Sequence, residues 1–328
     1  DIDHVETVGG SPQRLALGAV VEQADLEGNQ AWQPGERADA IIVGVPSWRT
    51  SLSPTRAHET PAAVRDALRR YSADALLTPS GIPLVVRDAG DIADPDAVGD
   101  GTGEEAAIAR IAELAAACDL VIVLGGDNAA TVPAALGVWG DRVGAAGLVT
   151  LDAHHDLRDG VSNGSPVRRL LEAGLDGARA TQLGIEPLAN SRFYAERAAQ
   201  HRISVVTRAE LARSSIPAER AAALDRAAST GGPVHVDLDL DVCDRAVAPG
   251  CPASVPGGIS ALELRRAARV AGAHHAVRGI DLTELDASAD AADGRTVRLA
   301  ALCVLEALAG LASRREHPDA ASPRGAPS

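Results

Sequence analysis

Acidic and imidazole side chains gather at the ends of three apolar runs in this 328-residue chain. The central run, residues 148–156, reads Leu-Val-Thr-Leu-Asp-Ala-His-His-Asp, and the other two cover residues 120–127 and 234–241. The side chains that we take as candidate metal ligands are Asp152, His154, Asp156, Asp239 and Asp241. Mixed carboxylate and imidazole ligands suit a borderline divalent cation such as manganese better than a thiolate-held zinc ion.

The spacing of these ligands favours a centre with more than one ion. Asp152, His154 and Asp156 alternate at the two-residue period of a strand, so they share one side if the extended geometry persists. Asp239 and Asp241 alternate in the same way. Clustered carboxylates repel one another unless cations neutralise them, and a pair of divalent ions generates a nucleophilic hydroxide near neutral pH.

Each motif also has a purely structural interpretation. An aspartate at a strand end often caps the next helix, and a lone histidine such as His155 or His235 is more often packed or exposed than a ligand. The three motifs together, in an alternating α/β chain, favour metal binding.

The elements that must position these ligands alternate between strand and helix. Apolar runs near residues 38, 120, 148, 180, 203, 234 and 276 indicate strands, and helical spacing between them predicts a mainly parallel sheet. We predict an α/β fold, a single-domain three-layer α/β/α arrangement over residues 38–313, with an N-terminal arm (1–37) and a disordered tail (314–328). Thr60 is the expected cap of a helix that Pro61 opens. Because the carboxyl ends of parallel strands share an edge, the ligands should converge there.

The composition excludes several classes of function. A formal charge of −14 lacks the basic face that nucleic acid requires, so a small-molecule substrate is expected. From the sequence we expect no apolar run long enough to cross a membrane and no signal peptide at the acidic start, and therefore a cytoplasmic protein. The four cysteines form no CxxC pair, which predicts ordinary thiols. Every basic residue is Arg, which rules out lysine chemistry.

The motifs resemble those of the ureohydrolase superfamily, which includes arginase, agmatinase and formimidoylglutamase. The resemblance rests on Gly-Gly-Asp at residues 125–127, Asp-Ala-His-His-Asp at 152–156, Asp-Leu-Asp-Val-Cys-Asp at 239–244, and the Ala-Pro-Gly and Pro-Gly-Gly segments near residues 248 and 256. It extends from about residue 44 through the last helix. It implies an arginase-like fold, two Mn²⁺ ions, and hydrolysis of a C–N bond in a guanidino or formimino group.

The resemblance also implies roles for individual residues. Asp152 and Asp239 bridge the ions, His154 and Asp241 serve one ion, and Asp156 serves the other. Glu284 pairs with the cationic group of the substrate, and Asp241 or a neighbour passes a proton to the leaving amine. Trimers or hexamers are common in the family, so a homo-oligomer is expected.

Two departures from the family pattern bear on the chemistry. Asn128 stands where relatives usually have a histidine ligand, and an amide oxygen binds manganese more weakly than imidazole, so the ion near Asn128 should bind loosely. Asn163 stands where arginase-like members carry a histidine thought to shuttle protons, which argues against arginase itself.

The loops after the central strand resemble the formimidoylglutamase branch most. The expected substrate-binding residues are Arg158, Asn163, Ser165 and Glu284. The planar fork of Arg158 suits a dicarboxylate substrate, whereas a solvated pair with Asp159 is the structural alternative. Two other functions stay open: hydrolysis of agmatine or a guanidino acid, and a binding role in a member that has lost turnover.

Overall fold

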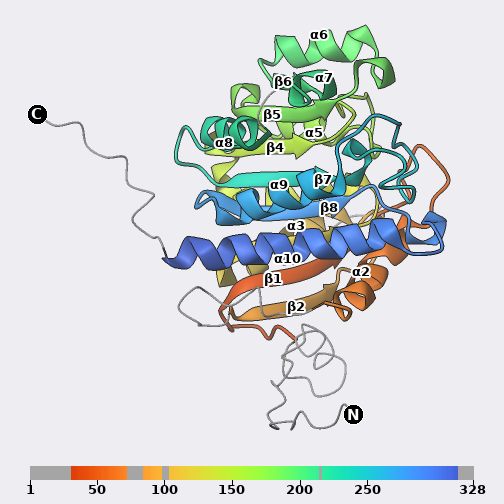
Figure 1. Cartoon of the computed structure of the whole chain (residues 1–328). Coiled ribbons are helices and arrows are strands. Elements are labelled where there is room, and N and C mark those ends of the chain that lie inside the picture. The colour runs from red at the N-terminus through yellow and green to blue at the C-terminus, as the bar shows by residue number, and fades with distance from the viewer. Residues whose placement is uncertain (1–30, 72–83, 98–102, 214–215, 317–328) are drawn as a thin grey trace, which may run out of the picture.

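One parallel sheet organises the chain in the computed structural model, which describes residues 31–71, 84–97, 103–213 and 216–316. The described residues form eight strands in the order β2-β1-β3-β8-β7-β4-β5-β6, and every neighbouring pair is parallel (Figure 1). The strands are β1 (Ala38–Val45), β2 (Val86–Asp91), β3 (Cys118–Gly125), β4 (Gly147–Leu151), β5 (Ala180–Ile185), β6 (Ser204–Thr207), β7 (Val234–Asp239) and β8 (Val277–Thr283).

Helices cover both faces of this sheet. One layer holds α2 (Thr60–Leu68), α8 (Ile216–Ala227), α9 (Ala261–Ala273) and α10 (Arg295–Glu316), with α10 lying along α9 and α2 (Figure 1). The other layer contains α3 (Glu104–Ala117), α4 (Thr131–Trp139) and α5 (Pro166–Glu172). The short α7 (Arg208–Leu211) and α6 (Arg192–Gln200) lie near the β6 edge. The predicted three-layer α/β/α fold with a parallel sheet is therefore confirmed.

Strands buried on both faces explain the continuous apolar runs of the sequence. All eight residues of β1 and all six of β7 are buried, as expected for a sheet covered on both sides. Side chains of β3 and β8 pack with α10 in one core, and alternate residues of β3 pack with α3 in another. The sheet is thus a rigid support for whatever follows its strands.

The hydroxyl groups at the starts of α9 and α2 differ in how they bond. Ser260 caps α9 with a reciprocal capping box, in which Glu263 bonds back to the Ser260 backbone. Thr60, expected to cap its helix, instead lies inside α2, and its hydroxyl donates to the Leu285 carbonyl at 2.5 Å. The Thr60 prediction is wrong because this bond to the loop after β8 takes the hydroxyl.

The ends of the domain differ in detail from the prediction. Residues 31–37 of the expected arm include Trp32, which is buried against the core beside β1, while residues 1–30 lie outside the described residues. Helix α10 continues to Glu316, past the expected boundary at residue 313, and the remainder of the predicted tail also lies outside the description. The division into arm, domain and tail stays a prediction.

Two expectations from composition can be compared with the structure. All four cysteines are buried free thiols, which confirms the absence of a disulfide framework. One helix, Arg295–Arg315 within α10, is long and apolar enough to cross a membrane by length and composition, contrary to the sequence expectation. Of its most apolar window, 72% is buried inside the domain, as in a core helix.

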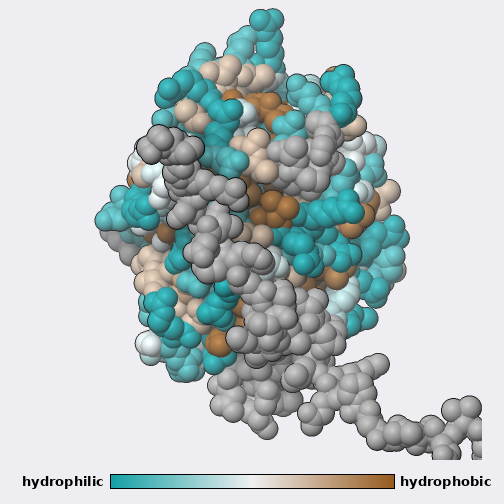
Figure 2. All heavy atoms as spheres, turned by 60° about the vertical axis from the view of Figure 1, so that its left-hand side comes forward, coloured by the Kyte–Doolittle hydropathy of each residue, from teal (hydrophilic) through white to brown (hydrophobic). Residues whose placement is uncertain are grey.

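On the face shown in Figure 2, hydrophilic residues predominate and apolar ones form small separate groups.

Candidate metal centre

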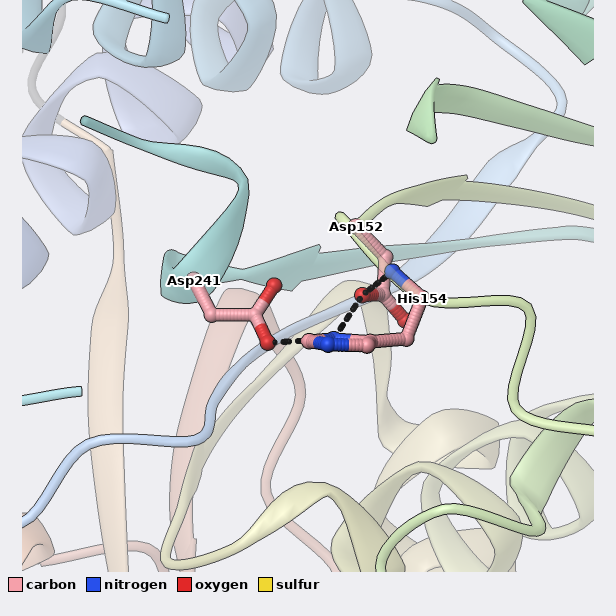
Figure 3. A group of neighbouring side chains, drawn as sticks. All are labelled: Asp152, His154 and Asp241. Atoms are coloured by element: carbon pink, nitrogen blue, oxygen red, sulfur yellow. Dashed lines mark hydrogen bonds and ion pairs between the residues drawn. The ribbon is translucent and has the colours of Figure 1, made fainter. Parts of the chain in front are cut away.

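Asp152, His154 and Asp241 form the tightest cluster of candidate ligands in the described part of the chain. Asp152 directly follows β4, and Asp241 lies in a 3₁₀ turn (Leu240–Val242) that directly follows β7. Their ligand atoms lie within 4.8 Å of one another, and His154 Nδ1 is 2.7 Å from Asp241 Oδ2 and 3.5 Å from Asp152 Oδ1 (Figure 3). Both aspartates are 1% exposed.

Backbone amides hold these carboxylates in place. Asp152 Oδ1 accepts from the His154 amide at 2.6 Å, and Asp241 Oδ1 accepts from the Ala153 amide at 3.0 Å. The Asp241 amide in turn donates to Asp239 Oδ1 at 2.8 Å. Asp152 Oδ2 is buried and has no hydrogen-bond partner among the described residues. A buried carboxylate oxygen without a donor is costly, and it fits a position that a cation occupies.

The electrostatics of the cluster show an excess of negative charge. Burial, together with the neighbouring aspartates, raises the pKa of Asp152 and of Asp239 well above the usual range. Burial opposes the charged form of His154, yet Asp241 and Asp152 raise the pKa of its imidazole to about 12. Crowded carboxylates must be neutralised. Without a metal ion, bound protons provide the positive charge that divalent cations provide in a metal site.

The extended geometry expected for residues 152–156 does not persist. Strand β4 ends at Leu151, and Asp156 has a φ of +52°, so the three ligands do not alternate along a strand. Glu284, after β8, has a φ of +59°. Left-handed backbone at a non-glycine residue is strained and is common at functional sites. The two turns, rather than the strand period, bring these carboxylates to the site.

Asn128 meets Asp156 through its amide nitrogen. Its Nδ2 donates to Asp156 Oδ2 at 2.5 Å, while its Oδ1 accepts from the hydroxyls of Thr131 at 2.7 Å and Thr283 at 3.0 Å. The amide oxygen expected as a weak ligand therefore faces two hydroxyls. Burial raises the pKa of Asp156 to about 7, and the charge of His154 and the bond from Asn128 oppose that rise.

Asp239 belongs to the cluster, whereas Asp237, two residues earlier on β7, does not. Asp239 is buried, its neighbours include Asp152 and Asp241, and it lines the cavity described below. Asp237 lies deeper, where it accepts from the Thr283 hydroxyl at 3.2 Å.

Glu284 is held by two amides at the edge of the cluster. Asn163 Nδ2 donates to both Glu284 oxygens, at 3.0 and 3.1 Å, and the Asn128 backbone amide donates to Oε2 at 3.0 Å. Asn163 Oδ1 also accepts from the Leu52 amide at 3.0 Å, so this side chain ties two loops to Glu284. Burial, with the charge of Asp127, raises the pKa of Glu284 to about 8, and the Asn163 bond opposes the rise.

A cavity of ≈ 480 Å³ opens above these groups, a size that suits a small molecule. Its wall includes Asp156, Arg158, Asn163, Asp239, Asp241 and Glu284. The structure does not bring Ser165 to this wall: the residue is 0% exposed, and its hydroxyl bonds within the loop to the carbonyl and amide of Ser162. Arg158 is exposed, as the structural alternative expected, but Asp159 pairs with Arg197 at 2.8 Å, and Arg158 lies on the cavity wall.

The structural interpretation does hold for some of the other motif residues. Asp127 Oδ1 accepts from the Ala129 amide at 3.2 Å, as a capping aspartate does. His155 Nδ1 bonds to Gln182 Oε1 at 2.7 Å, and His235 Nε2 bonds to Asp281 Oδ2 at 2.9 Å, both buried.

Sequence reasoning missed part of the cavity wall. Asn190, Ser191 and Tyr194 come from the start of α6, and Leu52 and Ser53 come from the loop after β1. No spacing in the sequence joins these segments to the metal motifs. The one available signal was the scarcity of aromatic residues, since Tyr194 is one of only two tyrosines in the chain.

Known proteins resemble this chain in sequence and in fold. Residues 38–310 match the model of the arginase family. Formimidoylglutamase from Halalkalibacterium halodurans is 33% identical over 288 residues, 84% of this chain and 88% of that protein, and the Bacillus subtilis protein of the same name is 31% identical over 289 residues (85% and 89%). The crystal structure of the Bacillus subtilis formimidoylglutamase superposes with a TM-score of 0.76 at 28% identity, covering 86% of this chain and 89% of that one.

A further solved structure, Trypanosoma cruzi formiminoglutamase with Mn²⁺, has a TM-score of 0.74 at 26% identity, covering 84% of this chain and 94% of that one. The family model spans well over half of the chain, and both curated relatives match it along most of their length. This chain belongs to the arginase family.

Proposed function

We propose that this chain hydrolyses N-formimino-L-glutamate to L-glutamate and formamide. The observation that carries the proposal is a cavity with carboxylates at its base and the guanidinium of Arg158 on its wall. Such a cavity offers an anionic partner to the positively charged amidine and a cationic partner to a substrate carboxylate. The likeness to formimidoylglutamases supports the same substrate.

We infer that the site holds two Mn²⁺ ions. Asp152, His154, Asp239 and Asp241 would hold one ion, and Asp156 would hold the other together with Asp152 and Asp239. The buried unpartnered oxygen of Asp152 and the mixed oxygen and nitrogen donors support a divalent cation of this type. When bound, manganese supplies a nucleophile from water at neutral pH.

Glu284 and Asp241 are the proposed catalytic side chains. Glu284, fixed by Asn163, orients the amidinium nitrogen so that water adds to the amidine carbon. The C–N bond to the glutamate nitrogen then breaks, and Asp241 passes a proton to that leaving amine. Water is consumed, and the two products are formamide and glutamate.

A hydrolysis assay tests this assignment. The manganese-loaded full chain is incubated with N-formimino-L-glutamate, arginine, agmatine and guanidino acids, and formamide, urea and ammonia are measured separately. Formamide release from N-formimino-L-glutamate alone is the expected result. Urea release from agmatine or a guanidino acid would show that the chain has the activity of another branch of the family. A chain that binds no manganese would favour a binding role without turnover.

We propose a homo-oligomer, a trimer or a hexamer, in the cytoplasm. Light scattering on the purified full chain measures its mass directly, and a monomer would contradict the oligomer.

A further inference from the structure

Arg158 forms no ion pair in the part of the chain that the structure describes, although its charge acts on the nearby Asp156. Its side chain is exposed on the cavity wall, while the adjacent Asp159 is taken by Arg197. An exposed arginine has many rotamers, and fixing them costs free energy on binding. What holds the guanidinium therefore matters for any anionic ligand.

Two residues, Gly164 and Tyr194, contact the Arg158 side chain, and we call this arrangement the slot. A methyl group added to Gly164 would lie 2.7 Å from Arg158 Cδ and 3.1 Å from Nε, so the arginine stem packs directly on the glycine. The guanidinium carbon lies 5.9 Å from the centre of the Tyr194 ring, within cation–π range. The Arg158 amide also donates to the Gly164 carbonyl at 3.0 Å.

Helix α6, which carries Tyr194, is also hydrogen-bonded to the loop that carries Arg158. Arg197 donates to the Leu157 carbonyl at 2.7 Å and to Asp159, and its guanidinium lies over the Phe193 ring. Phe193 packs edge-on against Tyr194, with ring centres 5.5 Å apart. Phe193, the only phenylalanine of the chain, therefore supports the Tyr194 ring.

We propose that Gly164 and Tyr194 are positioning residues that hold Arg158 over the cavity and thereby determine the preference for a substrate with a carboxylate. The inference rests on the proposed function and extends it to residues outside the metal motifs. Glu284 selects a positive group at one end of the substrate, and the slotted Arg158 selects a negative group at the other. A substrate with two positive ends, such as agmatine, satisfies only the first.

The chain offers a mild way to disturb the slot. Gly164 has no positive φ, so Gly164→Ala keeps the backbone. The close atoms belong to the side chains of Arg158 and Leu52, which can move away. Tyr194→Leu removes the ring, and Tyr194→Phe keeps it. Gly144→Ala is the matched control, because a methyl group there meets no atom within 4 Å.

The test measures kcat and KM for N-formimino-L-glutamate and for its diamide, which carries no carboxylate. Gly164→Ala and Tyr194→Leu should raise KM for the dicarboxylate roughly three- to tenfold, more than they lower kcat, since they displace a binding group. KM for the diamide should stay near that of the wild type. Tyr194→Phe and Gly144→Ala should behave like the wild type with both compounds.

Three outcomes would overturn the inference. An active wild type whose KM is unaffected by both slot variants shows that the slot has no role. Equal changes for the dicarboxylate and the diamide show a general structural effect. A change in Mn²⁺ affinity, followed by electron paramagnetic resonance, with KM unchanged, shows that Arg158 acts through Asp156 instead. A wild type that releases no formamide would contradict the proposed function itself, and this result differs from all three outcomes above.

Discussion

The two halves of the metal centre are built from different chemistry. In the first half, Asp152, His154 and Asp241 approach one another directly, and one carboxylate oxygen is left without a donor. In the second half, Asp156 accepts from Asn128 and Glu284 accepts from Asn163, so neutral amides already satisfy the carboxylates. The first half leaves a carboxylate oxygen open to a cation, whereas in the second half amide hydrogen bonds compete with a cation for the carboxylates. Two ions bound here should therefore differ in affinity.

The largest expected effect comes from breaking the first half. Asp241→Asn keeps the size of the side chain but removes the charge that faces His154, so we expect kcat/KM to fall by about three orders of magnitude because the metal-derived nucleophile is lost. Metal analysis should find the tight ion missing. The matched variant Asp156→Asn should retain that ion, and equal metal loss in both variants would refute the contrast between the halves.

Asn128→His should sharpen the comparison by making the second half more like the first. An imidazole in place of the amide removes the donor to Asp156 and supplies a better ligand for manganese, so the weaker dissociation constant should fall roughly 10- to 100-fold. Titration of metal-free protein followed by electron paramagnetic resonance measures each constant. No change in the weaker constant, with both ions countable, would argue against this account.

Manganese should stabilise the fold, mainly through the first half. At a hundredfold excess over its dissociation constant, a bound ion adds about 2.7 kcal/mol to the free energy of unfolding, which corresponds to a rise of several degrees in Tm. Thermal melts of metal-free and loaded protein measure this rise. Asp241→Asn should abolish most of it and Asp156→Asn should retain most of it, and the reverse order would contradict the assignment of the tight site.

The smallest effect is expected at Ser165, which the structure removes from the cavity. Ser165→Ala loses two hydrogen bonds to Ser162, so we expect a loss of about 1 kcal/mol in the free energy of unfolding. KM for N-formimino-L-glutamate should stay unchanged, because the hydroxyl does not reach the cavity wall. Urea denaturation and steady-state kinetics measure the two quantities, and a raised KM with normal stability would restore Ser165 as a substrate-binding residue.

Periodicity in the sequence was sufficient for the fold because buried parallel strands leave continuous apolar runs. The apolar runs near residues 180 and 234 were predicted as strands, and β5 and β7 lie there. Thr60 was predicted wrongly, since its partner is a carbonyl 225 residues away in sequence. A local sequence pattern predicts hydrogen bonds between near neighbours. It cannot predict that a distant carbonyl will bind the same hydroxyl.

The site itself was predictable in composition but not in geometry. Residue types and their positions after strands identified Asp152, His154 and Asp241, which the fold does bring together. The left-handed turns at Asp156 and Glu284 break the strand period, and no residue there is the glycine that usually signals such a turn. The orientation of the Asn128 amide follows from two threonine hydroxyls, and Thr283 comes from a strand far along the chain.

The place of β8 in the sheet has a consequence for how the molecule is made. This strand, the last of the described strands to be synthesised, fits between β3, which is synthesised long before it, and β7, which directly precedes it among the strands. Until it arrives, the two ladders that flank it have no common partner, and Glu284 has not yet been added to the nascent chain. The catalytic pocket and the continuous sheet are therefore completed in one late event, and a chain cut short before residue 277 lacks both.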